Sequence, residues 1–170
     1  GALHGMLIAT NAGSNAVLFD FIGHGSNQKK LINQPAESAG TTQQLVAQLS
    51  DIIKFIHEKF GNEISISLVG HSMASDIVIR ASADERIESV VAISPYSTGI
   101  TPDFPKDLLL ISGQFENHLR SHALKMVKTF RPAAKENTKY ADERIRRKAA
   151  YIKNTGHVSV IYAPQTTKII

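Results

Sequence analysis

Cysteine is absent from this chain, and that absence excludes several classes of protein. Disulfide frameworks, thiol nucleophiles and cysteine-based metal sites all require that residue. Long hydrophobic runs are also missing: no apolar stretch is long enough to cross a bilayer, and no signal peptide is evident. We therefore expect a cytoplasmic protein without a membrane-spanning segment.

An excess of charge of either sign is lacking too, because the formal net charge is only +4. Such a modest value gives little reason to expect nucleic acid as a partner. Basic residues gather at 144–148 beside two acidic ones, and this mixture favours a solvated helix face. The length of 170 residues suits one domain, 1–170, with a sizeable core.

Short apolar segments alternate along the chain with longer helical patterns. The predicted strands are residues 16–21, 64–69, 89–94, 107–112 and 149–153. Most of them are almost continuously apolar, as expected for parallel strands that helices cover on both faces. Residues 42–60 carry apolar side chains at three- and four-residue spacing and predict the clearest helix. The fold class is therefore α/β, a mostly parallel open sheet flanked by helices.

The segment Gly70-His71-Ser72-Met73-Ala74 lies between a predicted strand and a predicted helix. A serine between small residues at such a turn is typical of a nucleophile elbow. The turn is so tight that larger side chains two positions before and after the serine would collide, so Gly70 and Ala74 must be small. The alternative is that Ser72 is an ordinary helix N-cap.

Three further landmarks accompany Ser72. Residues 19–26 read Phe-Asp-Phe-Ile-Gly-His-Gly-Ser, residues 110–116 are a strand end with glycine and then an acid, and residues 153–160 contain a loop histidine. In this order the chain resembles an α/β-hydrolase, in particular the monoacylglycerol-lipase and serine-aminopeptidase branch. The resemblance extends from about residue 16 to about residue 163.

The resemblance implies a serine hydrolase with Ser72 as nucleophile, His157 as base and Glu116 as the acid that orients it. A serine hydroxyl needs a neighbouring base, and imidazole titrates near neutrality. A carboxylate on the far ring nitrogen stabilises the imidazolium. Asp103 is the alternative acid, because some members of the family take theirs from the loop after the preceding strand.

The resemblance also implies an oxyanion hole made by the backbone N–H of Met73 and a second N–H from an earlier loop. Leu3-His4-Gly5 is one candidate for that loop and makes Met6 the second donor. The competing interpretation places residues 6–10 inside a helix. Only 15 residues separate His4 from Asp20, so the N-terminal strands of the family's sheet are expected to be truncated, as in a fragment or a natural deletion.

The interval 95–106 is too short for the helical lid that many hydrolases of this fold carry. We therefore expect an open, shallow site without a lid, where a small-molecule acyl substrate binds. The predicted reaction is cleavage of a carboxylic ester or related acyl bond through an acyl-enzyme, with no metal and no organic cofactor. The alternatives are a non-catalytic binding domain with an α/β-hydrolase-like fold, and an acyltransferase.

Overall fold

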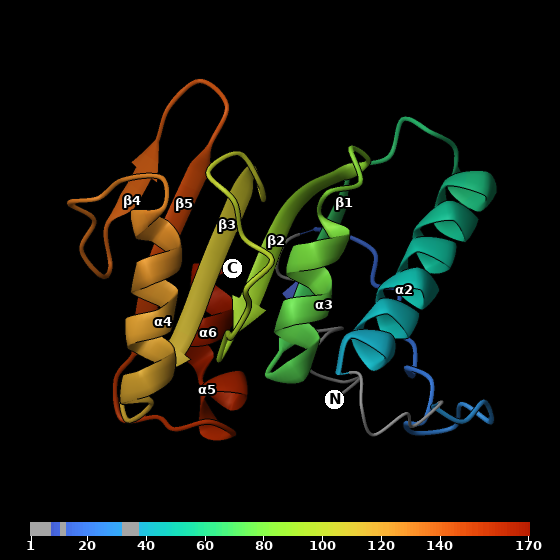
Figure 1. Ribbon diagram of the computed structural model, residues 1–170, viewed down its shortest axis with the longest axis horizontal. Helices are drawn as coiled ribbons and strands as arrows, with labels where there is room; N and C mark the ends of the chain where they lie inside the picture. Colours follow the sequence, from blue (N-terminus) through green and yellow to red (C-terminus); the bar gives the residue numbers. More distant parts are fainter. Residues whose placement is uncertain (1–7, 11–12, 32–37) are drawn as a thin grey trace.

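The computed structural model describes residues 8–10, 13–31 and 38–170. Five strands form one sheet in the order β1-β2-β3-β5-β4 (Figure 1). The strands are β1 Ile66–His71, β2 Ile87–Ile93, β3 Asp107–Gly113, β4 Lys139–Ala141 and β5 Arg146–Ile152. β1, β2, β3 and β5 are mutually parallel, and only β4 pairs antiparallel, with β5. The expected α/β class with a mostly parallel sheet is confirmed.

Helices cover both faces of this sheet. They are α2 Ser38–Phe60, α3 Met73–Ala81, α4 Asn117–Lys128, α5 Ser159–Tyr162 and α6 Pro164–Ile169. In Figure 1, α3 and α4 lie in front of the sheet, whereas α5 and α6 lie behind it. α3 contacts β1 and β2, α4 contacts β3 and β5, and α5 contacts β3. α2 packs against α3.

The central strands divide their side chains between the two layers. In β2, Val90 faces the cluster shared with α2, α3 and α4, whereas Val91 belongs to the cluster shared with α5 and α6. Leu110 and Ile111 of β3 divide in the same way, and both are fully buried. Successive strand residues point to opposite faces, so a strand covered on both sides must be apolar throughout. This requirement explains the nearly unbroken apolar runs.

α2 begins four residues earlier than the predicted helix and ends where expected, at Phe60. Leu45, Leu49 and Ile53 form its buried stripe, each no more than 3% exposed. Phe60 closes the apolar pattern but is 57% exposed, because it lies in the last turn, before Gly61 ends the helix.

Two expectations are wrong. Residues 16–21 form no strand, and residues 16–20 are exposed. A β-branched, apolar composition favours a strand only where a neighbouring strand offers its backbone, and no described strand pairs with this segment. The basic residues at 144–148 lie on no helix: Arg146 begins β5, and Arg147 is 1% exposed.

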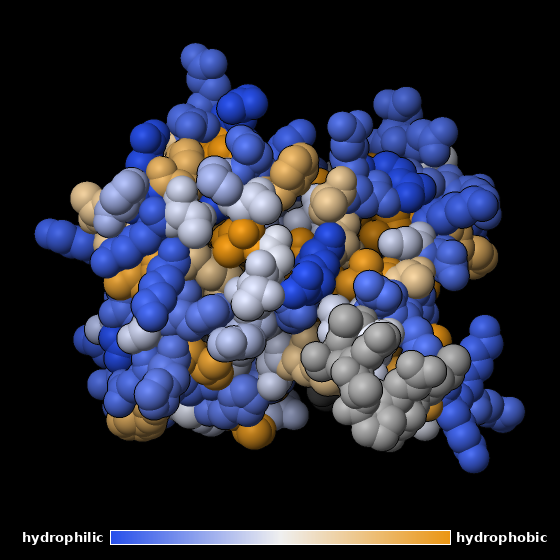
Figure 2. Space-filling view, in the orientation of Figure 1, coloured by the Kyte–Doolittle hydropathy of each residue, from blue (hydrophilic) through white to orange (hydrophobic). Residues whose placement is uncertain are grey.

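The face shown in Figure 2 is largely hydrophilic, with separate hydrophobic patches between the covering helices. Among the described helices, none combines the length and the apolar character needed to span a membrane. Residues 95–106 form a loop without helix or strand. This loop joins the carboxyl end of β2 to the amino end of β3.

Candidate active site

Four polar side chains follow the carboxyl ends of four adjacent parallel strands. Ser72 comes directly after β1, and Ser94 comes directly after β2. Glu116 follows β3 by three residues, and His157 follows β5 by five. Because the carboxyl ends of parallel strands meet at one edge of the sheet, these residues converge there. Open α/β sheets place their ligand sites at this edge.

Ser72 occupies a strained turn between β1 and α3. Its φ of 56° and ψ of −123° lie outside the regions that ordinary side chains prefer. A Cβ added to Gly70 would lie 2.5 Å from the carbonyl oxygen of Ala74, so the turn closes tightly around the serine. Ser72 stands at the N-cap position of α3, yet its side chain makes no capping hydrogen bond. The side chain is therefore available for another contact.

That contact is with His157, which lies 85 positions along the chain. The Ser72 Oγ is 3.0 Å from His157 Nε2, and His157 Nδ1 is 2.6 Å from Glu116 Oε1. A neutral imidazole satisfies both contacts when its Nδ1–H donates to the carboxylate and its Nε2 accepts from the hydroxyl. The structure thus joins Ser72, His157 and Glu116 in one chain of hydrogen bonds.

The Glu116 side chain is 5% exposed and receives three hydrogen bonds. Besides His157, the backbone N–H of Gly113 donates to Oε2 over 2.5 Å, and Ser94 Oγ donates to the same oxygen over 2.9 Å. Together these donors fix the orientation of the carboxylate. This buried carboxylate is therefore held toward His157.

Asp103, the alternative acid, lies elsewhere. Its side chain is 69% exposed and stands 3.9 Å from the guanidinium of Arg144. The structure brings Glu116, and not Asp103, to the imidazole of His157.

His71 holds the loop that carries His157. Its Nε2 lies 2.9 Å from the backbone carbonyl oxygen of His157, and the two rings are 4.9 Å apart. A carbonyl oxygen only accepts, so His71 Nε2 carries a proton and donates it. Burial lowers the pKa of His71, despite the opposing effect of this hydrogen bond. The side chain thus ties β1 to the loop after β5.

Of the two predicted oxyanion donors, the structure describes one. Met73 is the first residue of α3, where backbone N–H groups have no partner within the helix. Its N–H is therefore available beside Ser72. Met6 and the Leu3-His4-Gly5 motif lie outside the described residues, whereas residues 8–10 are helical.

A cavity of about 280 Å³ opens in front of Ser72. Its lining residues are Ser72, Met73, Asp76, Ser94, Tyr96, Thr98, Leu119 and His157. Tyr96 is 60% exposed and stacks on His122 with ring centroids 4.4 Å apart, which places the loop after β2 at the rim. Asp76 is engaged by Arg80 and by Ser97 Oγ. Within the described part of the chain, residues 95–106 form no helix that could cover this cavity.

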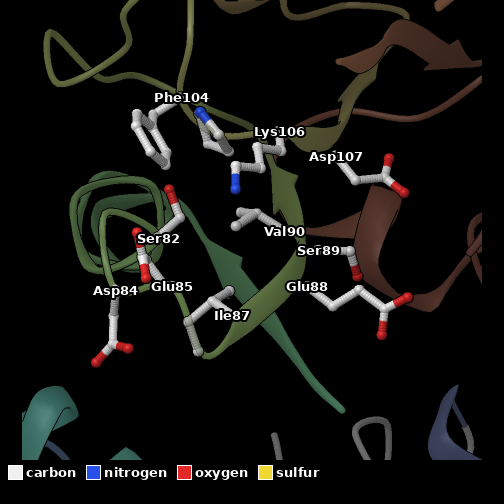
Figure 3. Close-up of a pocket in the computed structure, with 11 residues that line it drawn as sticks. Ser82, Asp84, Glu85, Ile87, Glu88, Ser89, Val90, Phe104, Lys106 and Asp107 are labelled. Carbon is white, nitrogen blue, oxygen red and sulfur yellow. The ribbon is translucent and has the colours of Figure 1, made fainter. Parts of the chain in front are cut away.

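A second depression lies at the amino ends of β2 and β3, far along the strands from Ser72 (Figure 3). Phe104 and Lys106 stand on one side of it, with Ser82 and Ile87 across from them. Its volume of about 10 Å³ is enough for one water molecule. It is therefore too small for an organic substrate.

The described residues contain no group of three or more histidine, cysteine, aspartate or glutamate side chains that could hold a metal ion. His118 and His122, four residues apart on α4, do not form such a site, since His122 Nε2 lies 2.9 Å from the carbonyl oxygen of Ser97. The chemistry within reach is proton transfer between a hydroxyl and an imidazole supported by a carboxylate.

No known protein-family model matches the chain, and no curated protein is significantly similar to it.

The sequence did not predict the hydrogen bonds that hold Glu116 and His157 in place. Ser94 and the Gly113 N–H donate to Glu116, and His71 donates to the backbone of His157. Ser94 directly follows a buried strand, as Ser72 does, and this shared position is the sequence signal that could have identified it. Its side-chain direction depends on a φ of 50°, which the sequence does not disclose.

Proposed function

We propose that the protein is a serine hydrolase of the α/β-hydrolase type that cleaves a carboxylic ester or a related acyl bond. The observation that carries this proposal is the continuous hydrogen-bond chain from Ser72 through His157 to Glu116. The strained turn at Ser72 supports it, because strain of this kind persists where the surrounding structure enforces it, typically at functional sites.

In the proposed reaction, Ser72 Oγ attacks the carbonyl carbon while its proton passes to His157 Nε2. Negative charge develops on the carbonyl oxygen. The backbone N–H of Met73, the residue directly after Ser72, donates a hydrogen bond to this oxygen. The leaving alcohol takes the proton from Nε2, which leaves an acyl group on Ser72. Water then attacks this ester, returns a proton through His157 and releases the acid.

Glu116 acts in both halves of this reaction. With its carboxylate on Nδ1, the ring presents Nε2 to the serine as an acceptor, and the positive charge that forms on the ring is balanced. His71 holds the backbone of the same histidine from the other side.

A fluorophosphonate probe tests the proposal directly, because it phosphonylates a serine that a neighbouring base activates. We expect stoichiometric labelling at Ser72 and none in Ser72→Ala. His157→Ala is expected to lower the labelling rate at least 10³-fold. The matched control is His118→Ala, which removes an exposed histidine of α4 and should label like the wild type. Labelling that is absent, or unchanged in His157→Ala, would overturn the proposal.

Acyl transfer is the second candidate, and the openness of the site favours it. The His157 side chain is 47% exposed, so an alcohol or amine can reach the acyl-enzyme in competition with water. With a p-nitrophenyl ester as donor, an added alcohol should then divert product from the free acid to the new ester. Formation of the free acid alone at high alcohol concentration assigns hydrolysis.

A purely binding role for the domain is the third interpretation. It requires neither the strain at Ser72 nor the directed contacts of Glu116. Folded protein that binds an ester without turnover and resists the probe would support it.

A further inference from the structure

Ser94 is a buried serine beside the candidate active site, and neither its position nor its conformation is ordinary. It is 1% exposed and has a φ of 50°, a left-handed conformation that is uncommon for a residue with a Cβ. Its backbone N–H donates to the carbonyl oxygen of Ile111 over 2.7 Å, which fixes the residue between β2 and β3. Glycine would adopt this backbone more easily. Since glycine would fit this backbone better, the hydroxyl group is the feature that explains a serine at this position.

The Ser94 hydroxyl is directed at the carboxylate that orients His157. Its Oγ lies 2.9 Å from Glu116 Oε2, the oxygen that does not contact the imidazole. The Gly113 N–H binds the same oxygen, while Oε1 faces His157 Nδ1. Two donors on one oxygen prevent the carboxylate from rotating about its terminal bond, and the other oxygen stays in line with the ring.

The second donor is itself held in place by close packing. A Cβ on Gly113 would lie 2.6 Å from the carbonyl oxygen of Thr155, so the end of β3 touches the loop that follows β5. The Gly113 N–H is a fixed backbone group. Of the two donors to Oε2, only the Ser94 hydroxyl belongs to a side chain that substitution can remove.

We propose that Ser94 is a positioning residue that locks the Glu116 carboxylate in the orientation required by His157. This inference rests on the proposed function, because it assigns Ser94 a part in the same reaction. The residue acts through Glu116 and His157. Positioning groups behind a reacting side chain matter because small misplacements slow a reaction strongly.

Other charged or titratable groups face the imidazole as well. His71 of β1 lies with its ring 4.9 Å away, Glu116 binds Nδ1, and Asp76 of α3 lines the same cavity. Neither His71 nor Asp76 has a hydrogen bond to Ser94 or Glu116 among the described residues. A change at Ser94 therefore reaches His157 through Glu116.

The test is a double-mutant cycle read by the rate of fluorophosphonate labelling. Ser94→Ala and Ser94→Gly each remove the hydroxyl, and the glycine also relieves the left-handed backbone, so a common effect is due to the hydroxyl. We expect each to label about tenfold more slowly than the wild type. In a Glu116→Gln background, Ser94→Ala should slow labelling no further, because the group through which it acts is already lost.

Ser112→Ala is the matched control. Ser112 is a fully buried serine of β3 whose hydroxyl has no partner among the described residues, so its removal should leave the labelling rate within twofold of the wild type. If Ser94→Ala and Ser94→Gly label like Ser112→Ala, the inference is wrong. An equal slowing by Ser94→Ala with and without Glu116→Gln also overturns it, since Ser94 then acts elsewhere.

A second readout does not depend on activity. The proton between His157 Nδ1 and Glu116 gives a far-downfield NMR signal when the hydrogen bond is short. We expect this signal to broaden or disappear in Ser94→Gly and to persist in Ser112→Ala. If the wild type resists the probe but the signal responds in this way, the proposed function fails while the contact from Ser94 stands. A signal unchanged in Ser94→Gly overturns the inference.

Discussion

Gly70 and Ala74 approach each other across the turn that carries Ser72, and a Cβ on Gly70 would lie 2.5 Å from the Ala74 carbonyl oxygen. The same Cβ would lie 2.9 Å from Val78 Cγ2, so it would meet both the backbone and the side chains of α3. The strand and the helix are thus packed as closely as their backbones permit. This packing supports the φ of 56° at Ser72.

Gly70→Ala is therefore expected to destabilise the fold by about 3 kcal/mol, because an extra methyl group in a fully packed site forces the backbone apart. Chemical denaturation measures the loss. Gly156→Ala is the control for stability, since no atom of the described residues lies within 4 Å of its added Cβ, and its unfolding free energy should change by less than about 1 kcal/mol. Equal effects of the two variants would contradict the tight turn.

Glu116→Gln is expected to slow fluorophosphonate labelling of Ser72 by about 10²-fold or more. The amide is of the same size, but it carries no charge to balance the imidazolium and can hold the ring in the wrong tautomer. Asp103→Asn removes the other acid considered from the sequence, an exposed carboxylate beside Arg144, and should leave the rate within twofold. A larger effect of Asp103→Asn than of Glu116→Gln would reverse the assignment.

Acid should destabilise the protein in part through His71. Burial lowers the pKa of this imidazole below its ordinary value of 6.5, so the unfolded chain takes up the proton first as the pH falls. The contribution of His71 to stability is complete above pH 6.5 and is lost as the pH falls through the lowered pKa. His71→Gln keeps an N–H donor for the His157 carbonyl and does not titrate.

The unfolding free energy of His71→Gln should therefore fall less steeply with acid below pH 6.5 than that of the wild type. Denaturation midpoints measured at several pH values give the two slopes, and the other histidines cancel in the difference. Parallel slopes would show that His71 does not contribute.

Four of the five predicted strands are present in the sheet. The sequence pattern that predicts each of them lies within the strand itself. Strands that helices cover on both faces must be apolar at every position, and β2 and β3 display this directly. Residues 16–21 have the same composition but form no strand, since composition does not disclose whether a partner strand is present. β4 was not predicted, because its three residues, two of which are exposed, are too few to show a periodic pattern.

For the candidate site, too, the local sequence predicts some features but not the contacts between distant segments. The turn at Ser72 is local, so its small neighbours were sufficient to predict it. Glu116 and His157 were assigned by resemblance, and their contact joins loops 41 positions apart. Ser94 and His71 contribute through hydrogen bonds that depend on backbone angles and on how two loops meet. Such contacts leave no pattern in one sequence.

Arg147 is expected to be essential for stability although it lies at the start of β5, away from Ser72. It is 1% exposed, and its guanidinium donates to the carbonyl oxygens of Thr101, Pro102 and Pro105 and to Thr129 Oγ1. Arg147→Met leaves these acceptors without donors and should cost about 3 kcal/mol of unfolding free energy. Arg144→Met, at an 80% exposed side chain, should change it by less than about 0.5 kcal/mol. Similar losses in the two variants would contradict the role of burial.

His57 of α2 offers the opposite prediction, a substitution that stabilises. It is 6% exposed, and neither ring nitrogen has a hydrogen-bond partner among the described residues. Burying a polar group without a partner costs free energy, and Leu45, Leu49 and Ile53 show that the buried stripe of this helix is otherwise apolar. His57→Leu should therefore raise the unfolding free energy by about 1 kcal/mol and leave labelling of Ser72 unchanged. His24→Leu, at an exposed histidine, should not stabilise the protein. A loss of stability in His57→Leu would show that the imidazole has a partner in the folded protein.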